Sequence, residues 1–418
     1  MKYGALAGLL ALLAACGDEN EGAASVALSP TGPGPNPAPP PPPSTAAGPH
    51  PFDDARLTSY RITLAQTDWD SIVADPFNDT WRRCNVEWEG RTYADCALRP
   101  AGDRSRIAGN PKPSFRVKFD EFVPNREFHK FSSIKFDALI HDRSMMRARL
   151  EYPVYVSRGV PAPQYVHCRM YVNGAYKGLY GAEERVSKEF LRKRFGTPVN
   201  QLYEWTASGT MHDVLWAGWD PATNYAPRMW IPEIEELPPD AEGVRSLCYA
   251  LNNDLPLFDT LFEVDSFLNF IAVETLLGEG DNYVAGPNGT RTANIKLCKV
   301  PATGKYMILP SDCDQGFFRP QNTITDPFQN RILTRNLILW SPANLSRYKT
   351  ILRELIQGPF ATSPMHARVD YVMDQIRQAA VEDPLKPYGN DSFEWEVQGI
   401  KSYIANRNSA FSSQVTGP

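Results

Sequence analysis

The side chains best suited to chemistry lie in the segment from Leu276 to Phe318. A polar loop presents Asp281, a predicted strand begins with Asn294, and the sequence SDCD then presents Asp312 and Asp314. Phosphoryl transfer to a hydroxyl needs one carboxylate that orients the nucleophile and accepts its proton, and an Asn and an Asp that hold Mg²⁺ against the phosphates. The segment supplies these types in that order. Taken alone, it also fits a turn-rich loop whose Asp and Asn side chains only stabilise turns.

Regular elements on both sides must position these side chains. An apolar stripe predicts a helix over 266–277, with Asp265 as its N-cap and Gly278 closing it. After the loop, NIKLCKV and KYMILPS predict a strand pair joined by the turn 301–304. The hairpin would then present Asp312 and Asp314.

The first half of the chain is predicted to form an antiparallel sheet, because apolar and polar residues alternate and an Asn-Gly turn occurs at 173–174. A helix over 144–155 is expected to be kinked or ended early by Pro153. The predicted strands cover 60–65, 114–119, 132–139, 165–172 and 176–184, with a hairpin about Gly90.

The second half is predicted to be mainly helical. Besides the helix that ends at Gly278, amphipathic segments cover 345–356, 367–380 and 400–411. A sheet-rich half followed by a helix-rich half indicates an α+β fold with a cleft between the two.

The N-terminal residues predict export and lipid anchoring. A basic start and a short apolar run indicate a signal peptide over 1–15, and Leu13-Ala14-Ala15-Cys16 fits a lipobox that would leave Cys16 lipidated. Residues 16–50 are Pro-rich and read as a linker, and residues 51–418 as the globular domain. The expected location is the cell envelope, outside the cytoplasm.

The remaining cysteines and the net charge limit the alternatives. A net charge of −5 argues against nucleic-acid binding. Six cysteines besides Cys16 allow three disulfides, and Cys84 and Cys96 should face each other across the hairpin at Gly90; buried free thiols are the alternative. No cysteine spacing resembles a zinc site. His141-Asp142-Arg143 is interpreted as polar surface sequence.

Several motifs occur in an order that resembles the CotH (spore coat protein H) kinase family, over roughly 57–411. The resemblance implies an atypical protein-kinase-like, two-lobed fold with an antiparallel-sheet N-lobe and a mainly helical C-lobe. The motifs are GDRSR from Gly102, PKPSFRVKF from Pro111, NGAYKGLYGAEE from Asn173, GEGDNY from Gly278, NIKL from Asn294, SDCD from Ser311 and IKSYIANR from Ile400.

Site roles follow from this resemblance, residue by residue. Asp281 matches the catalytic Asp; Asn294 and Asp312 match the metal ligands, and Asp314 the second acid of the loop. Glu184 matches the Glu that pairs with a phosphate-binding lysine. The basic candidates for that role are Lys112, Arg116 and Lys118, which share one face of a regular strand. The resemblance also places Gly102, Ser105 and Arg106 in a loop that faces the nucleotide. A polar hairpin turn without such a role is the alternative interpretation of these three residues.

The sequence departs from the family pattern at the presumed nucleotide site. The loop between Asp281 and Asn294 is long, which makes Asn282 and Asn288 alternative metal ligands. Ala101, Pro113 and Ser311 stand where the family usually has an arginine, a basic residue and a tryptophan.

Two function classes remain. The first is an ATP- and Mg²⁺-dependent kinase acting on Ser/Thr hydroxyls of an exported protein. The second is a pseudokinase or surface assembly protein that uses the same fold for binding. A hydrolase using Asp312 and Asp314 lacks the additional His and Asp ligands that two-metal phosphatases need.

Overall fold

The computed structural model describes residues 49–102, 104–196, 201–205, 230–234, 237–283, 293–318, 323–326 and 328–416. The chain divides into a unit Met1–Ala38, which lies outside the described residues, and a unit Pro39–Pro418, which holds all of them. The predicted signal peptide, Cys16, nearly all of the linker and Asn288 therefore lie outside the described residues.

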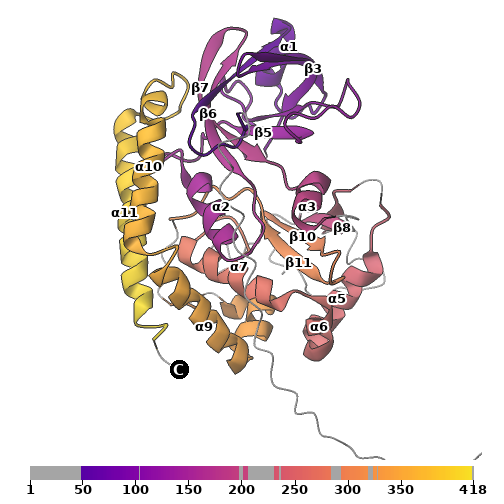
Figure 1. Ribbon diagram of the computed structural model, residues 1–418, viewed down its shortest axis with the longest axis vertical. Coiled ribbons are helices and arrows are strands. Elements are labelled where there is room, and N and C mark those ends of the chain that lie inside the picture. The colour runs from indigo at the N-terminus through magenta and orange to yellow at the C-terminus, as the bar shows by residue number, and fades with distance from the viewer. Residues whose placement is uncertain are drawn as a thin grey trace, which may run out of the picture. The chain divides into compact units, whose positions relative to one another are not determined.

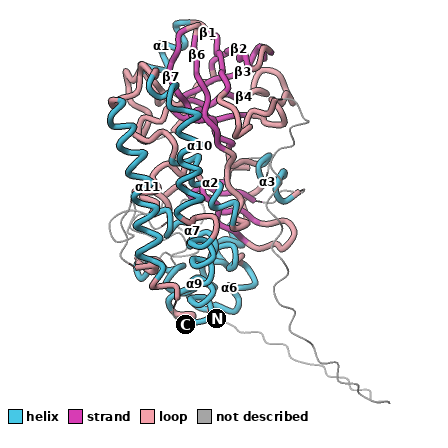
Figure 2. The backbone as a smooth tube through the Cα atoms, turned by 60° about the vertical axis from the view of Figure 1, so that its left-hand side comes forward, coloured by secondary structure: helices cyan, strands magenta, loops and turns pink. Residues whose placement is uncertain are grey.

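Seven strands of the described chain form a closed barrel in the order β1-β2-β3-β4-β5-β7-β6 (Figures 1 and 2). Their bounds are β1 Thr58–Leu64, β2 Arg82–Trp88, β3 Arg91–Pro100, β4 Phe115–Lys118, β5 Ser133–Asp137, β6 Tyr165–Val172 and β7 Ala175–Glu184. Buried and exposed residues alternate along β1 and β2, as the sequence predicts for strands with one face in a core.

The predicted two-lobed, protein-kinase-like fold with an antiparallel-sheet lobe is wrong. The strands close on themselves because β1 pairs with β6 in parallel, with Thr58 opposite Cys168. The alternation of apolar and polar residues predicts each strand, and short turns predict its pairing with the next strand along the chain. Neither pattern predicts the pairing of β1 with β6, which are far apart in the sequence. Closure removes the sheet edges that an open lobe would expose.

Aromatic side chains fill the barrel. Phe128 stacks on Phe119 with ring centroids 4.7 Å apart, and Tyr60 and Phe136 meet edge to face at 4.9 Å. Each of these four side chains is fully buried. Burying large aromatic surfaces supplies much of the driving force for a small barrel, so the interior is a packed core.

Helices and a second sheet make up the rest of the described chain. The sheet has the order β11-β10-β8-β9. Its strands are β8 Gln201–Trp205, β9 Trp230–Pro232, β10 Ile295–Lys299 and β11 Tyr306–Pro310. The helices are α1 Gln66–Ala74, α2 Arg147–Ser157, α3 Lys188–Phe195, α5 Ala241–Asn253, α6 Leu255–Leu261, α7 Val264–Leu277, α8 Ile332–Thr334, α9 Pro342–Gln357, α10 Thr362–Val381 and α11 Asn390–Ser412, with a short 3-10 helix η2 Phe328–Asn330 and a short π-helix η3 Arg335–Leu339.

Helix α7 lies at the centre of the helical part, next to α2, α9 and β11 (Figure 1). It has buried residues on all sides, and it ends at Gly278, whose left-handed backbone (φ 60°) confirms the predicted stop. The predicted cap is wrong: the helix begins one residue before Asp265, and Asp265 lies in its first turn. Helix α2 also continues past Pro153, which the sequence predicts as a kink or an early end.

Helices α10 and α11 lie side by side, and α10 also contacts the barrel at β7 (Figures 1 and 2). The Tyr176 hydroxyl donates to the Ala379 carbonyl over 3.2 Å, so the helix pair is fixed to the barrel. None of the described helices is both long and apolar enough to cross a membrane.

The predicted hairpin about Gly90 is confirmed, and Cys84 lies opposite Cys96 in the register of β2 and β3. The two residues are nevertheless free thiols, as are the other four cysteines of the described chain. The predicted disulfide is therefore absent from this part of the structure. Burial raises the pKa of Cys96 to about 11.

Candidate functional site

A row of charged side chains crosses four neighbouring strands on the outer face of the barrel. In the strand register Arg99 lies opposite Arg116, Arg116 opposite Lys135, and Lys135 opposite Glu183. Residues directly opposite each other in a sheet point to the same face. Strand pairing alone therefore gathers three cations and one carboxylate that are far apart in the sequence.

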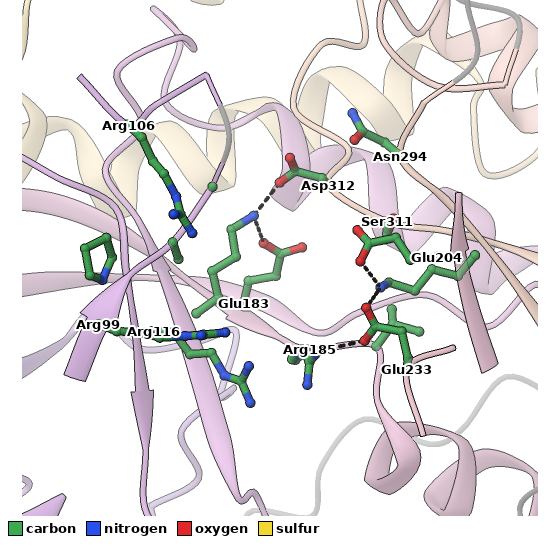
Figure 3. A pocket seen from close by; sticks show the side chains of 16 residues that line it. Arg99, Arg106, Arg116, Glu183, Arg185, Glu204, Glu233, Asn294, Ser311 and Asp312 are labelled. Carbon is green, nitrogen blue, oxygen red and sulfur yellow. Dashed lines mark hydrogen bonds and ion pairs between the residues drawn. The ribbon is translucent and has the colours of Figure 1, made fainter. Parts of the chain in front are cut away.

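Lys135 holds two carboxylates together. Its Nζ lies 2.9 Å from a Glu183 carboxylate oxygen and also contacts Asp312 (Figure 3). Burial disfavours the charged lysine, but Asp312 and Glu183 outweigh it and keep the pKa of Lys135 well above its usual value. Tyr152 of α2 fixes the other oxygen of Glu183 with a 2.7 Å hydrogen bond, so the carboxylate is held from two sides.

Asn294 and Asp312 meet because they flank a strand pair. Asn294 directly precedes β10 and Asp312 closely follows β11, and the Ser311 amide donates to the Asn294 carbonyl over 3.0 Å. Both residues have left-handed backbones, with φ of 50° at each. Such a conformation is uncommon for residues other than glycine and occurs often at functional sites.

Asp281 follows α7 in the turn after Gly278 and is largely buried. The Asn294 amide donates to the Asp281 carbonyl over 2.8 Å and lies 3.5 Å from its carboxylate. The Gln315 amide also lies 3.5 Å from that carboxylate. Two segments that are distant in the sequence, those of Asn294 and Gln315, therefore contact Asp281.

Two adjoining cavities share Gly102, Lys135, Asn294 and Asp312. The larger has a volume of about 330 Å³ and the smaller of about 90 Å³. Besides the shared residues, the larger is lined by Arg99, Pro100, Ala101, Arg106, Arg116, Glu183, Arg185, Val186, Glu204, Glu233, Lys296 and Ser311. The smaller is lined by Arg104, Ser105, Asp137, His141, Asp281, Ala293, Asp314 and Gln315.

The larger cavity is rich in cations. Arg99 and Arg116 lie near each other on its barrel wall, away from Asp312 and Asn294 (Figure 3), and each stacks over Trp81, at 4.6 and 5.5 Å. Burial and the charges of Arg185 and Arg99 lower the pKa of Arg116 to about 9. Guanidinium groups recognise phosphate oxygens well, so this wall suits a polyphosphate.

Carboxylates dominate the smaller cavity. Burial, followed by the charges of Asp312 and Asp137, raises the pKa of Asp314 well above its usual value. The Lys135 ammonium has the opposite effect on Asp312 and lowers its pKa. Crowded oxygen donors of this kind fit a hard divalent cation such as Mg²⁺, which would relieve their repulsion.

The structure brings most of the predicted site residues together. Gly102, Arg106, Arg116, Asn294 and Asp312 line the larger cavity. Asp281, Asp314 and Ser105 line the smaller one. Gly102 has φ 90°, and a side chain there would collide with the Ser105 hydroxyl, so the turn requires glycine.

Lys112, Lys118 and Glu184 lie outside both cavities, as does Asn282, the alternative metal ligand. Lys112 is completely buried, and its ammonium lies 2.7 Å from the Asp383 carboxylate. Lys118 pairs with Glu121 at 2.7 Å on the surface. Glu184 points away from Lys135 and pairs with Arg194 at 2.6 Å. The lysine and glutamate that pair with each other at the larger cavity are Lys135 and Glu183.

The segment His141-Asp142-Arg143 agrees with the prediction only in part. His141 and Arg143 are exposed, as predicted, whereas Asp142 is buried, pairs with Arg147 and accepts the Ser144 amide at 2.9 Å. His141 lines the smaller cavity. The sequence contained one indication that Lys135 belongs to the site. Lys135 lies between apolar residues in a predicted strand, so its side chain must face away from the barrel core.

Comparison with known proteins identifies the family. A family model described as CotH kinase protein matches residues 98–411. This range contains every residue of both cavities. No curated protein matches the chain.

Proposed function

The chain belongs to the CotH kinase family, and from this premise we propose that it transfers the γ-phosphate of ATP to Ser or Thr hydroxyls of an exported or cell-envelope protein. We further propose that the enzyme acts outside the cytoplasm, anchored by lipid at Cys16. The family supports a kinase-like phosphotransferase activity. The acceptor, the cofactors and the location are proposals that rest on the site and on the N-terminal sequence.

The observation that carries the proposal is the contact of Lys135 with both Glu183 and Asp312. Protein kinases use a lysine-glutamate pair to hold the phosphates and an aspartate to hold the metal ion. Here one ammonium group touches both carboxylates, at the boundary between the cationic and the acidic cavity. A triphosphate would therefore have cations along its length and the carboxylates at its reacting end.

In this proposal Asp281 orients the acceptor hydroxyl and receives its proton. Asn294 fixes the segment of Asp281 through the 2.8 Å hydrogen bond to its carbonyl. Lys135 places a positive charge beside the transferred group, and Arg99 and Arg116 bind the remaining phosphates. Positioning and charge neutralisation supply most of the catalysis of phosphoryl transfer.

Asn294, Asp312 and Asp314 would hold Mg²⁺. The crowding that raises the pKa of Asp314 supports this assignment, because a bound cation would stabilise the ionised carboxylates. When bound, the ion neutralises charge on the phosphates. The paired strands β10 and β11 fix the positions of Asn294 and Asp312, so these ligands are already oriented before the ion binds.

Replacement of Asp281 by Asn tests the role of this residue. We expect phosphate transfer to fall about 10²- to 10⁴-fold, because a carboxylate that accepts a proton in the transition state contributes that much. Binding of ATP with Mg²⁺, measured by calorimetry, should persist. Asp70→Asn, an exposed aspartate of α1 outside both cavities, is the control. Transfer at the wild-type rate in Asp281→Asn would show that the base lies elsewhere.

A binding-only role is the second candidate. It is favoured by Ala101 and Ser311, which line the larger cavity where the family usually has an arginine and a tryptophan. In that case calorimetry should show no Mg²⁺-dependent heat on addition of ATP. Such a result would reject the kinase proposal, and the protein would then act as a pseudokinase or an assembly factor.

A further inference from the structure

Behind the loop that carries Asp312 and Asp314, three buried side chains from three segments converge. Glu151 comes from α2, Glu279 follows α7, and Cys313 lies in the loop itself. Their potential ligand atoms all lie within 4.8 Å of one another. All three residues are at most 2% exposed.

This cluster is distinct from the proposed Mg²⁺ site. Cys313 stands between two aspartates that line the smaller cavity, yet Cys313, Glu151 and Glu279 line neither cavity. The loop therefore presents carboxylates to the cavity and a thiol to the protein interior.

The two carboxylates lack compensation in the interior. One oxygen of Glu151 accepts the Gly316 amide at 2.9 Å, and one oxygen of Glu279 accepts the Asp281 amide at 3.2 Å. The second oxygen of each is buried and meets no donor from any other described residue. The two carboxyl groups lie against each other; burial raises the pKa of both, and this mutual contact lowers the pKa of Glu151 and raises the pKa of Glu279. Burying a carboxylate is costly unless a proton or a cation neutralises it.

The neighbouring cation is already engaged. Arg147 donates one nitrogen to the Gly316 carbonyl and pairs through the others with Asp142 and Glu396. Consistent with weak compensation, burial raises the pKa of Glu151 to about 7, and burial together with the Glu151 charge raises that of Glu279. The negative charge of the cluster is therefore not neutralised by Arg147, and a bound cation would stabilise it.

Asn282 adds a fourth potential donor. Its amide nitrogen lies 3.3 Å from the Cys313 sulfur, and its amide oxygen is buried without a hydrogen-bond donor in the described part of the chain. An amide presents either its oxygen or its nitrogen to a neighbour after a half-turn about its last bond. A half-turn would direct the oxygen of Asn282 toward the sulfur.

We propose that Glu151, Glu279 and Cys313 bind a structural zinc-class divalent cation, with the Asn282 amide oxygen or a water molecule as fourth ligand. Zinc binds thiolate sulfur at about 2.3 Å and carboxylate oxygen at about 2.0 to 2.2 Å in tetrahedral sites. Mg²⁺ prefers oxygen ligands alone, so the thiol of Cys313 makes this site selective for zinc over Mg²⁺. A small inward movement of the side chains would complete the site.

Such an ion would tie α2 to both catalytic segments. Glu279 lies two residues before Asp281, and Cys313 directly follows Asp312. Metal binding would therefore fix the positions of the proposed base and the proposed Mg²⁺ ligand without touching substrate. This structural role does not depend on whether the protein is a kinase or a binding protein.

The experiment uses the full chain, purified without chelators. We expect about one zinc per chain by elemental analysis, and a near-ultraviolet thiolate-to-metal band after exchange with Co²⁺. Chelation should lower the melting temperature, and Zn²⁺ should restore it. Cys313→Ser should abolish the Co²⁺ band, and Glu279→Gln should lower metal content, whereas Cys298→Ser, a buried thiol on β10, should change neither.

Measurements on the wild-type protein are sufficient to reject the proposal, so the test does not depend on whether the variants fold. A chain that contains no zinc and gives no Co²⁺ band after loading would show that the two carboxylates share a proton instead. Equal metal content in Cys313→Ser and in the wild type would also overturn it, because it would place the metal at another site.

Discussion

Lys135→Met tests the central contact of the site. Methionine keeps much of the length and apolar surface of the lysine stem but removes the charge, so the ammonium contacts to Glu183 and Asp312 are lost. The sequence motif alone would instead favour Lys112, Arg116 or Lys118. The structure predicts that replacement of Lys135 lowers phosphate transfer more than replacement of Lys112 or Lys118.

The expected magnitude follows from the role of a fixed charge. Removing one group that stabilises developing charge costs about 10²- to 10³-fold in kcat, or about 2.7 to 4 kcal/mol. Folding is also affected, because Glu183 is only 6% exposed and loses its cation. The Lys135 side chain is 22% exposed, so solvent screening limits this loss of stability to about 1 to 3 kcal/mol.

The assay measures Mg²⁺-dependent phosphate release from ATP and transfer to the chain itself, beside urea unfolding. Lys118→Met, which breaks only a surface pair, is the matched control and should retain activity. Lys135→Met/Glu183→Gln should regain stability but not turnover. If Lys118→Met lost activity while Lys135→Met kept it, the assignment of the phosphate-binding lysine would be wrong.

Two further predictions concern stability. Lys112→Met should lower the free energy of unfolding in urea by about 3 to 5 kcal/mol, because it leaves the buried Asp383 carboxylate without its ammonium; Lys112→Met/Asp383→Leu should recover part of that loss, and an unchanged single variant would contradict the reasoning. His167 is buried between the Met145 carbonyl and Arg149, and burial and the Arg149 charge lower its pKa to about 3. Only the unfolded chain then binds a proton there, so the free energy of unfolding should fall by up to about 1.4 kcal/mol per pH unit as the pH drops from about 6.5 towards 3. His167→Gln should flatten that part of the profile, and an identical slope in the variant would refute the assignment.

Local patterns predicted much of the site because its acidic half is built from a hairpin. Asn294 and Asp312 flank two strands that neighbour each other in sequence and were predicted as a pair, and the pairing of these strands brings the two residues together. The stop at Gly278 likewise follows from local chemistry, and it places Asp281 in the next turn. These residues were predicted without knowledge of distant pairings.

The cationic half was predicted less well because it depends on which strands pair. Glu183 and Glu184 differ by one position, and in a strand this difference reverses the face to which a side chain points. Glu183 faces Lys135, whereas Glu184 faces Arg194. The motif gave the strand correctly, but only the register of β5 and β7 decides between the two residues.

Lys112 shows a second kind of limit. Its partner Asp383 lies just beyond the end of α10, 271 positions away in sequence. The carboxylate also accepts the Leu179 amide at 3.0 Å, so it joins the barrel to the C-terminal helices. Sequence alone does not distinguish a buried lysine with a remote partner from a phosphate-binding lysine, because the burial and the partner of Lys112 depend on a distant segment.

The arrangement of charge bears directly on whether the site still binds ATP. At Ala101 and Pro113 the sequence lacks basic residues that the family usually carries, which by itself predicts a weaker nucleotide site. The row across β3, β4 and β5 nevertheless places Arg99, Arg116 and Lys135 opposite one another on one face. Positive charge missing from the loop is therefore supplied from the adjoining strands. Since phosphate affinity depends on the positions of cations in space and not in sequence, the cations of these strands offset the basic residues that are absent at Ala101 and Pro113.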